Sequence, residues 1–308
     1  MHGTTSSVGT TGRLSGPAPG DITAEVEPAW RPWVRLLEVA WRAADDPAWD
    51  RAVPEPVAAR PLHAPLLEGA VVHVDARRVR RLVRDLLHEA ERSDGERESP
   101  RAPPPRRRLD ALAVLRGGIT QDDDVLGSVA AAAGVDAGRL AVVAHLAATP
   151  LLRACAERFR DRIDPGWMRG YCPVCGAWPV LAELRGLERN RRLRCGRCAS
   201  DWALPVLHCP YCDELHHERL RSLLPEGHEQ TRRVDTCDTC KGYIKAFSGL
   251  QPMPFRALVA ADLASVELDI VAQERGYARP VHAAHALSIA LERATTARAT
   301  TPRPAAEP

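Results

Sequence analysis

Four short motifs between residues 172 and 240 decide how this chain folds, and each places two cysteines three positions apart. They are Cys172-Pro173-Val174-Cys175, Cys195-Gly196-Arg197-Cys198, Cys209-Pro210-Tyr211-Cys212 and Cys237-Asp238-Thr239-Cys240. Together they contain eight of the nine cysteines in the chain. Two thiolates at this spacing can bind one ion from a single tight turn. The stretch is therefore predicted to bind metal through these eight residues.

The motifs form an internal repeat of two ribbons. Strand-like segments at 178–184 and 191–194 join the first motif to the second, and segments at 218–224 and before Arg233 join the third to the fourth. Gly176 is expected to take the positive φ that the first turn demands. The favoured pairing is sequential, first motif with second and third with fourth, and an interleaved pairing is the alternative. Thiol–disulfide chemistry is disfavoured, because it is typical of one Cys-X-X-Cys at the start of a helix.

The identity of the two ions is left open by the ligands alone. Four sulfur ligands suit either zinc or a single rubredoxin-type iron. A closed four-thiolate shell has no position for water, so hydrolytic metal catalysis is disfavoured. Each ion is expected to contribute on the order of 10–16 kcal/mol of apparent binding free energy, so the ribbons should unfold without metal. Four nearby histidines are alternative ligands, although ordinary surface positions are favoured for them: His208, His216, His217 and His228.

Composition argues against a generally basic nucleic-acid-binding protein. The formal net charge of the 308-residue chain is +2, and two dications in tetrathiolate sites would lower it by about four. One basic run could hold a phosphate backbone, but charge compensation of the nearby thiolates is the favoured role. Its members are Arg189, Arg191, Arg192, Arg194 and Arg197.

Helices are predicted before the ribbons. Residues 1–24 are expected to be disordered, and 25–166 to form an all-helical domain with a proline-rich loop at 93–108. Asp136 is expected to start one helix and Thr149-Pro150 to start the next. Cys155 falls on an apolar stripe, which favours a core position over a reactive one. Four arginines are interpreted as the solvated face of one helix: Arg77, Arg80, Arg81 and Arg84.

A helical segment is predicted after the ribbons, at 251–294, before a disordered tail at 295–308. Its first helix should bury Val259, Leu263, Val266 and Ile270. Asp262, Glu267 and Asp269 are expected on its solvated face, and a short helix is expected from His285 to Leu291. The fold class is thus α+β: the helical domain, two tandem rubredoxin-like or zinc-ribbon modules at 167–205 and 206–250, and a C-terminal helix.

The cytoplasm is the expected compartment. Residues 1–20 lack the apolar core of a signal peptide. Asp136 and Arg139 interrupt the apolar stretch 129–148, so no membrane-spanning run is expected. In a reducing compartment, regularly spaced cysteines favour metal binding over structural disulfides.

Several motifs resemble the bacterial formate dehydrogenase accessory protein family, FdhE, over about residues 167–280. They are Cys172-Pro173-Val174-Cys175-Gly176, the Cys195 and Cys198 motif with Trp202 beyond it, Gly242-Tyr243-Ile244-Lys245 after Cys240, Ala261-Asp262-Leu263-Ala264-Ser265, and Glu274-Arg275-Gly276-Tyr277-Ala278-Arg279. The proline-rich loop and both tails depart from the family's compact pattern.

The resemblance implies a cytoplasmic assembly factor rather than an enzyme. It implies that the chain contacts the catalytic subunit of a respiratory formate dehydrogenase, with no membrane insertion, and that the eight cysteines hold two rubredoxin-like irons. Iron is thereby favoured over zinc, and a homo-oligomer is left open. A rubredoxin-type electron-transfer protein and a nucleic-acid-binding zinc ribbon are the alternatives from other classes.

Overall fold

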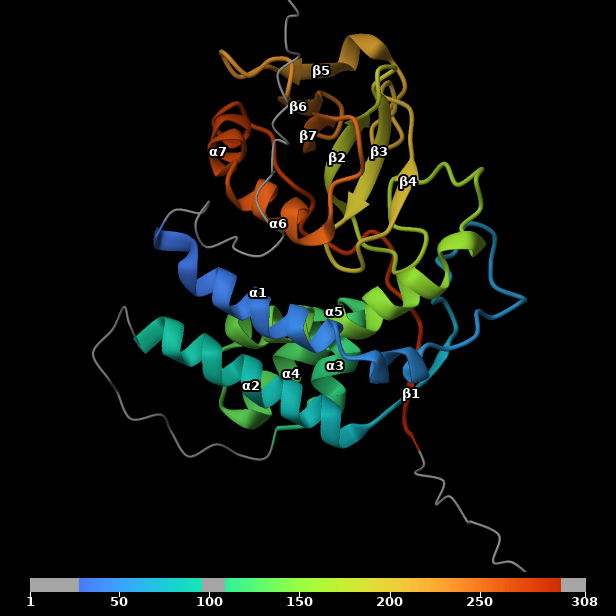
Figure 1. Ribbon diagram of the computed structural model, residues 1–308, viewed down its shortest axis with the longest axis vertical. Helices are drawn as coiled ribbons and strands as arrows, with labels where there is room; N and C mark the ends of the chain where they lie inside the picture. The colour runs from blue at the N-terminus through green and yellow to red at the C-terminus, as the bar shows by residue number, and fades with distance from the viewer. Residues whose placement is uncertain (1–27, 96–108, 295–308) are drawn as a thin grey trace, which may run out of the picture.

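A layer of helices and a six-stranded sheet form most of the described part of the chain, residues 28–95 and 109–294 of the computed structural model (Figure 1). This confirms the α+β class, with helices first and two four-cysteine ribbons after them. The expectations for residues 1–24, 96–108 and 295–308 lie outside the described residues. Residues 93–95, expected to begin the proline-rich loop, still belong to a helix.

The helical layer surrounds one apolar helix, α5 (Ala137–Arg158). Around it pack α1 (Arg31–Ala44), α2 (Ala76–Gly95), α3 (Ala111–Thr120) and α4 (Asp123–Ala133). Short 3-10 helices lie at Pro28–Trp30, Pro47–Ala52, Arg160–Arg162 and His217–Arg219. Three aspartates cap helix starts by accepting backbone N–H bonds: Asp110 for α3, Asp122 for α4 and Asp136 for α5.

The predicted helix boundary at Thr149-Pro150 is wrong, because α5 continues through it. Pro150 removes one backbone donor from the helix interior. The Thr149 hydroxyl donates to the carbonyl of His145 (3.4 Å), and the buried neighbours on both sides of this turn hold the helix together. Among the described residues, α5 is also long and apolar enough to cross a membrane by length and composition. Within the protein, 61% of that window is buried.

The two ribbons share a single sheet, in the order β4-β3-β2-β7-β6-β5. Their strands are β2 (Pro179–Arg185), β3 (Asn190–Cys195), β4 (Asp201–Ala203), β5 (Leu220–Leu223), β6 (Arg232–Cys237) and β7 (Tyr243–Gly249). Neighbours are antiparallel within each ribbon. The junction is the parallel pair β2 and β7, in which Ala182 lies opposite Ala246. The two ribbons thus form one continuous sheet rather than two separate modules.

The C-terminal segment differs from its prediction at two places. Instead of one helix, α6 (Phe255–Leu263) and α7 (Val266–Glu274) follow the sheet, and the break between them changes the helical phase. Ile270 is consequently 51% exposed, while Leu268 is buried against Val234 and Tyr243.

The short helix expected from His285 to Leu291 is wrong, because residues 285–289 are irregular and strand β8 (Ala290–Arg293) follows them. It pairs in parallel with β1 (Val71–Val74), a strand inside the region expected to be all-helical. An extended backbone satisfies its hydrogen bonds here, since Ala290 N donates to Ala70 O (3.0 Å). The chain therefore ends its described path on the helical layer and connects the two layers (Figure 1).

Candidate metal centres

The first four-cysteine cluster joins the first and second motifs. The sulfurs of Cys172, Cys175, Cys195 and Cys198 all lie within 4.8 Å of one another. The closest pairs are Cys172 with Cys198 at 3.4 Å and Cys175 with Cys195 at 3.6 Å. A tetrahedral ion with metal–sulfur bonds of about 2.3 Å requires sulfurs about 3.8 Å apart. The spacing fits such an ion and is much longer than a disulfide bond of about 2.05 Å.

The second cluster joins the third and fourth motifs. It consists of Cys209, Cys212, Cys237 and Cys240, again within 4.8 Å of one another. The pairs Cys209–Cys240 and Cys212–Cys237 are both separated by 3.7 Å. The sequential arrangement of motifs is confirmed, and the interleaved alternative is wrong. Two four-cysteine clusters that could hold metal ions are present among the described residues.

All four motifs fold into the same turn. The residue four positions after the first cysteine donates its N–H to that cysteine's carbonyl in the first three motifs, with N–O distances of 3.0 to 3.2 Å. In every motif that residue has positive φ: Gly176 (72°), Ala199 (69°), Asp213 (57°) and Lys241 (57°). The sequence pointed to this conformation only at Gly176, because the other three positions carry side chains that rarely adopt it.

Backbone N–H groups point at one or more sulfurs of each cluster. Val174 N lies 3.4 Å from Cys172 Sγ, and Gly242 N lies 3.3 Å from Cys240 Sγ. The Cys209 thiol, followed by backbone and other thiol donors, lowers the pKa of Cys240 to about 5. Burial works to raise the pKa of Cys195, but hydrogen bonds from neighbouring thiols hold it well below its usual value. The pKa values of Cys172 and Cys198 in the first cluster are raised, chiefly by burial, so the four thiols of a cluster do not shift alike.

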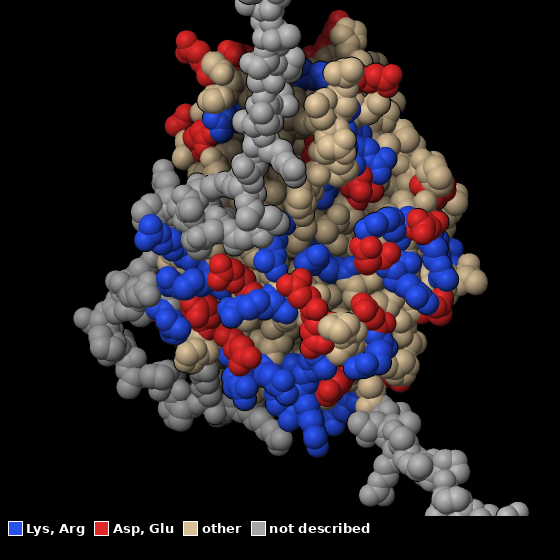
Figure 2. All heavy atoms as spheres, viewed as in Figure 1, with Lys and Arg blue, Asp and Glu red and all other residues tan. Residues whose placement is uncertain are grey.

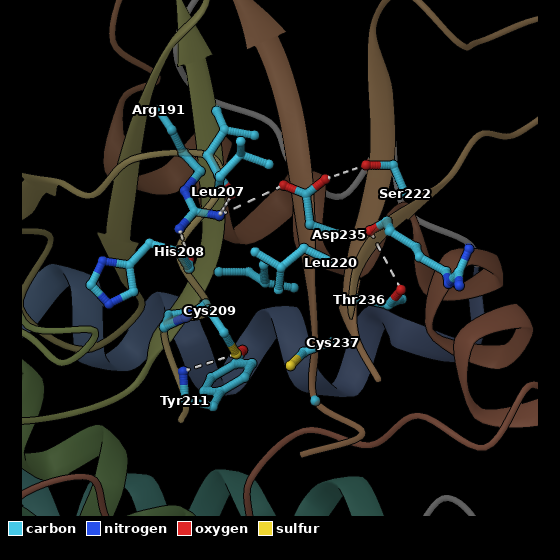
Figure 3. Close-up of a pocket in the computed structure, with 15 residues that line it drawn as sticks. Arg191, Leu207, His208, Cys209, Tyr211, Leu220, Ser222, Asp235, Thr236 and Cys237 are labelled. Carbon is cyan, nitrogen blue, oxygen red and sulfur yellow. Dashed lines mark hydrogen bonds and ion pairs between the residues drawn. The ribbon is translucent and has the colours of Figure 1, made fainter. Parts of the chain in front are cut away.

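Arg191 hydrogen-bonds to the segment between the two ribbons, residues 204–208. Its guanidinium is buried and donates to the carbonyls of Leu204 (3.1 Å) and His208 (2.6 Å). Asp235, on β6, approaches it to 3.9 Å. Figure 3 shows this group beside the second cluster, with Cys209 and Cys237 across a small cavity. Arg191 is thus an internal connection between the two halves of the sheet.

Arg194 and Arg197 are also buried. Arg194 pairs with Glu183 and donates to the carbonyl of Met253 (3.0 Å). Arg197 donates to the carbonyls of Gly118 and Ile119, the latter at 3.4 Å, so the second motif holds the end of α3. Three of the five arginines in the basic run are therefore engaged inside the protein. Such residues are not available to a phosphate backbone.

Surface charge is mixed on the face shown in Figure 2, apart from one edge of the helical layer. There Lys and Arg side chains gather over the first half of α2, whose exposed arginines are Arg77, Arg80, Arg81 and Arg84. Exposure agrees with the solvated face predicted for them.

A buried ionic network joins β7, α6, α7 and the C-terminal segment. Lys245 is fully buried, and its ammonium lies 2.8 Å from Asp262 and 2.7 Å from Asp269. Arg279 contacts the same two carboxylates at 2.8 and 2.9 Å, and the Tyr243 hydroxyl donates to Asp269 at 2.8 Å. Burial works to raise the pKa of Asp269, but the neighbouring cations, Arg279 first, hold it below its usual value.

The prediction that Asp262 and Asp269 lie on a solvated face is therefore wrong. Only Glu267 of that set is more than half exposed in its side chain, and it pairs with Arg232 at 3.0 Å. Their seven-residue spacing was no guide to a shared face, because Asp262 lies on α6 and Asp269 on α7. One signal was Lys245, which lies among the buried residues of strand β7.

The remaining candidates lie outside the clusters. His208 bonds to Asp213 at 2.9 Å, and three other histidines are exposed: His216, His217 and His228. Each cluster in the described part of the chain consists of sulfurs alone. Cys155 is buried in the helical core, and burial raises the pKa of its thiol, so a core role fits.

Residues 206–285 match the family model described as FdhE, C-terminal domain. The chain is 34% identical over 111 residues to a protein FdhE homolog from Haemophilus influenzae, covering 35% of this chain and 36% of that one. It is 36% identical over 117 residues to a Pseudomonas aeruginosa homolog, covering 36% and 38%. It is 32% identical over 125 residues to protein FdhE of Escherichia coli, covering 39% and 38%.

These matches thus span little more than a third of the length of the relatives. The crystal structure of the FdhE protein from Pseudomonas aeruginosa is similar with a TM-score of 0.46 and 20% identity, over 82% of this chain and 94% of that one. The matched family domain contains the second cluster together with Lys245, Asp262, Asp269 and Arg279. The chain thus carries a segment, residues 206–285, that matches the FdhE C-terminal domain.

Proposed function

We propose that the chain is an accessory factor required for the activity of a formate dehydrogenase, and that it acts by binding the catalytic subunit of that enzyme. The observation that carries the proposal is the match of residues 206–285 to the FdhE C-terminal domain. The motif residues behind the resemblance form the buried network of Lys245, Asp262 and Arg279. A rigid sheet held in this way offers a partner protein a fixed surface.

The eight clustered cysteines act as ligands for two metal ions in this proposal. The fit of the sulfur spacing to a tetrahedral ion supports it. Both four-thiolate shells are closed, so the ions shape the surface and bind no substrate, and the chain itself is not an enzyme. Iron of the rubredoxin type is favoured over zinc by the family resemblance. The cytoplasm is the proposed compartment, where such thiolates stay reduced.

Deletion of the gene tests the proposed function. In a host that uses formate, deletion should abolish formate oxidation while the catalytic subunit is still synthesised. A plasmid copy of the wild-type chain or of Cys155→Ser should restore activity, because Cys155 lies outside both clusters. Cys175→Ser should not restore it. Unchanged formate oxidation in the deletion strain would refute the proposal.

Metal analysis tests the ligand assignment separately. Protein purified without added zinc should contain two ions per chain and, with iron, should absorb visible light through sulfur-to-iron charge transfer. Fewer than two ions in a folded, reduced chain would contradict the assignment of eight ligands.

Electron transfer is the second candidate function, and the exposure of Cys212 and Cys240 favours it. An iron in the second cluster would lie near solvent and could exchange one electron with a partner, cycling between the ferric and ferrous states. Potentiometric titration of the iron form should then give a reversible one-electron wave. A redox-silent protein that still restores formate oxidation would eliminate this candidate.

A further inference from the structure

The two clusters differ sharply in their exposure to solvent. In the first cluster, three cysteines are fully buried and Cys198 is 1% exposed. In the second, Cys209 and Cys237 are buried, whereas Cys212 and Cys240 are exposed. Thiol reactivity and ligand exchange both depend on access to the sulfur. The two clusters therefore have the same four-cysteine ligands, but only the second one exposes cysteines to solvent.

The first cluster is enclosed by the contact between the two layers. Leu66 N and Leu67 N donate to the carbonyls of Pro173 and Val174, at 2.8 and 3.2 Å. On another side of the motif, a Cβ built on Gly176 would lie 2.8 Å from the carbonyl oxygen of His285. All four cysteines belong to the main apolar core. Cys198 borders a large cavity between the layers, but none of the four cysteines is more than 1% exposed.

The second cluster lies outside that core. Its two exposed cysteines face solvent on one side. Its two buried ones, Cys209 and Cys237, line a cavity of about 60 Å³ on the other side, with Tyr211 beside them (Figure 3). Two of its residues with positive φ, Asp213 and Lys241, directly follow Cys212 and Cys240. Local opening at these turns requires no movement of the helical layer.

We propose that the second cluster is a metal-exchange site, open through Cys212 and Cys240 to thiolate and chelating ligands, and that the first cluster is a closed structural site. The inference rests on the proposed role of the cysteines as metal ligands. In the exchange step, an incoming thiolate forms one metal–sulfur bond as the bond to Cys212 or Cys240 breaks. The displaced thiolate takes a proton from solvent, and the oxidation state of the ion does not change.

Zinc release from the full chain tests the proposal. Protein loaded with two zinc ions is challenged with excess EDTA, and the remaining bound zinc is measured over time. One equivalent should leave at least about tenfold faster than the other, because its release needs only local opening. In parallel, N-ethylmaleimide labelling followed by mass spectrometry should modify Cys212 and Cys240 before any cysteine of the first cluster.

Two variants show which cluster releases the fast equivalent of zinc and which the slow one. Cys212→Ser should eliminate the fast phase and leave the slow equivalent and the thermal unfolding of the helical layer unchanged. Cys155→Ser, which alters a buried thiol outside both clusters, should keep both phases. Release of both ions at one rate, or labelling of Cys172 or Cys175 as fast as Cys212, would overturn the proposal. A starting content below two ions in the wild-type chain would instead count against the ligand assignment itself.

Discussion

At the scale of single residues, the four motif turns share a backbone conformation but not a residue type. Gly176 has no room for a side chain, since an added Cβ would lie 2.8 Å from His285 O and 3.2 Å from Pro65 Cγ. Ala199 takes the same conformation at a cost of about 1–2 kcal/mol for a residue with a Cβ. The equivalent positions should therefore respond in opposite ways to exchange of glycine and alanine.

We expect Gly176→Ala to lower the free energy of unfolding by about 1–3 kcal/mol, from backbone strain plus the contact with His285. Ala199→Gly should raise it or leave it within about 1 kcal/mol, because relief of strain is partly offset by the entropy of glycine in the unfolded chain. Urea denaturation of the zinc-loaded chain measures both. Equal effects of the two substitutions would contradict this account of the turn.

The buried network gives a second prediction at the same scale. Lys245→Met leaves Asp262 and Asp269 in a protein interior with one cation fewer, which should cost about 3–5 kcal/mol. The control is Arg232→Met, which breaks the pair with the half-exposed Glu267 and should cost less than about 1 kcal/mol. Denaturant unfolding of each variant gives the difference. Similar costs would mean that Lys245 contributes no more than a surface charge.

At the scale of elements, contact between helices depends on glycine in α3. A Cβ on Gly118 would lie 2.1 Å from the carbonyl oxygen of Ala144 on α5, so the two backbones touch. Gly127, in α4, has nothing within 4 Å of the same position. We expect Gly118→Ala to separate α3 from α5 and lower the melting temperature.

Gly127→Ala is the matched control, and it should stabilise the protein by about 0.5–1 kcal/mol through helix propensity alone. Differential scanning calorimetry compares the two variants. An unchanged melting temperature for Gly118→Ala would show that α5 can move away from α3 without loss of stability. That result would contradict the central place of α5 in the core.

The sequence was sufficient to predict elements that depend on local chemistry and insufficient for those that depend on distant partners. Cysteine spacing placed all four turns, and aspartate caps placed helix starts such as that of α5 at Asp136. Nothing local indicated that β2 would pair in parallel with β7, or that β8 would join β1 rather than form a helix. Pro150 was misleading, because its cost in a helix is offset by burial that only the tertiary structure supplies.

In the candidate site, too, the sequence predicted the features that depend on local chemistry and missed those that depend on distant partners. The eight cysteines and their sequential grouping could be identified from spacing. Lys245 stood out within its strand, but its ion pair with Asp269 could not be predicted, because the two residues lie on different elements. The difference in exposure between the clusters was equally hidden, because it arises from the packing of the first cluster into the main core shared with the helical layer.

At the scale of the whole molecule, the first cluster lies where the main core passes from helices into sheet. Its four cysteines pack in the same apolar cluster as Leu151 and Leu152 of α5, and Arg197 connects its second motif to the end of α3. The ion proposed there would thus support the interface between the layers as well as one ribbon. Loss of the metal should therefore affect the two layers unequally.

We expect removal of both ions with EDTA at reducing conditions to unfold the sheet and to leave the helical layer compact but less stable. The reason is that each structural ion contributes on the order of 10–16 kcal/mol to the fold around it, whereas α1 to α5 retain their own contacts around α5. Hydrogen exchange measured by mass spectrometry separates the two responses. Amides of β2, β3, β6 and β7 should lose protection almost completely, while those of α5 should lose it only in part. Protection that stays unchanged throughout the sheet after the ions have gone would mean that strand pairing and the Lys245 network hold this fold without metal.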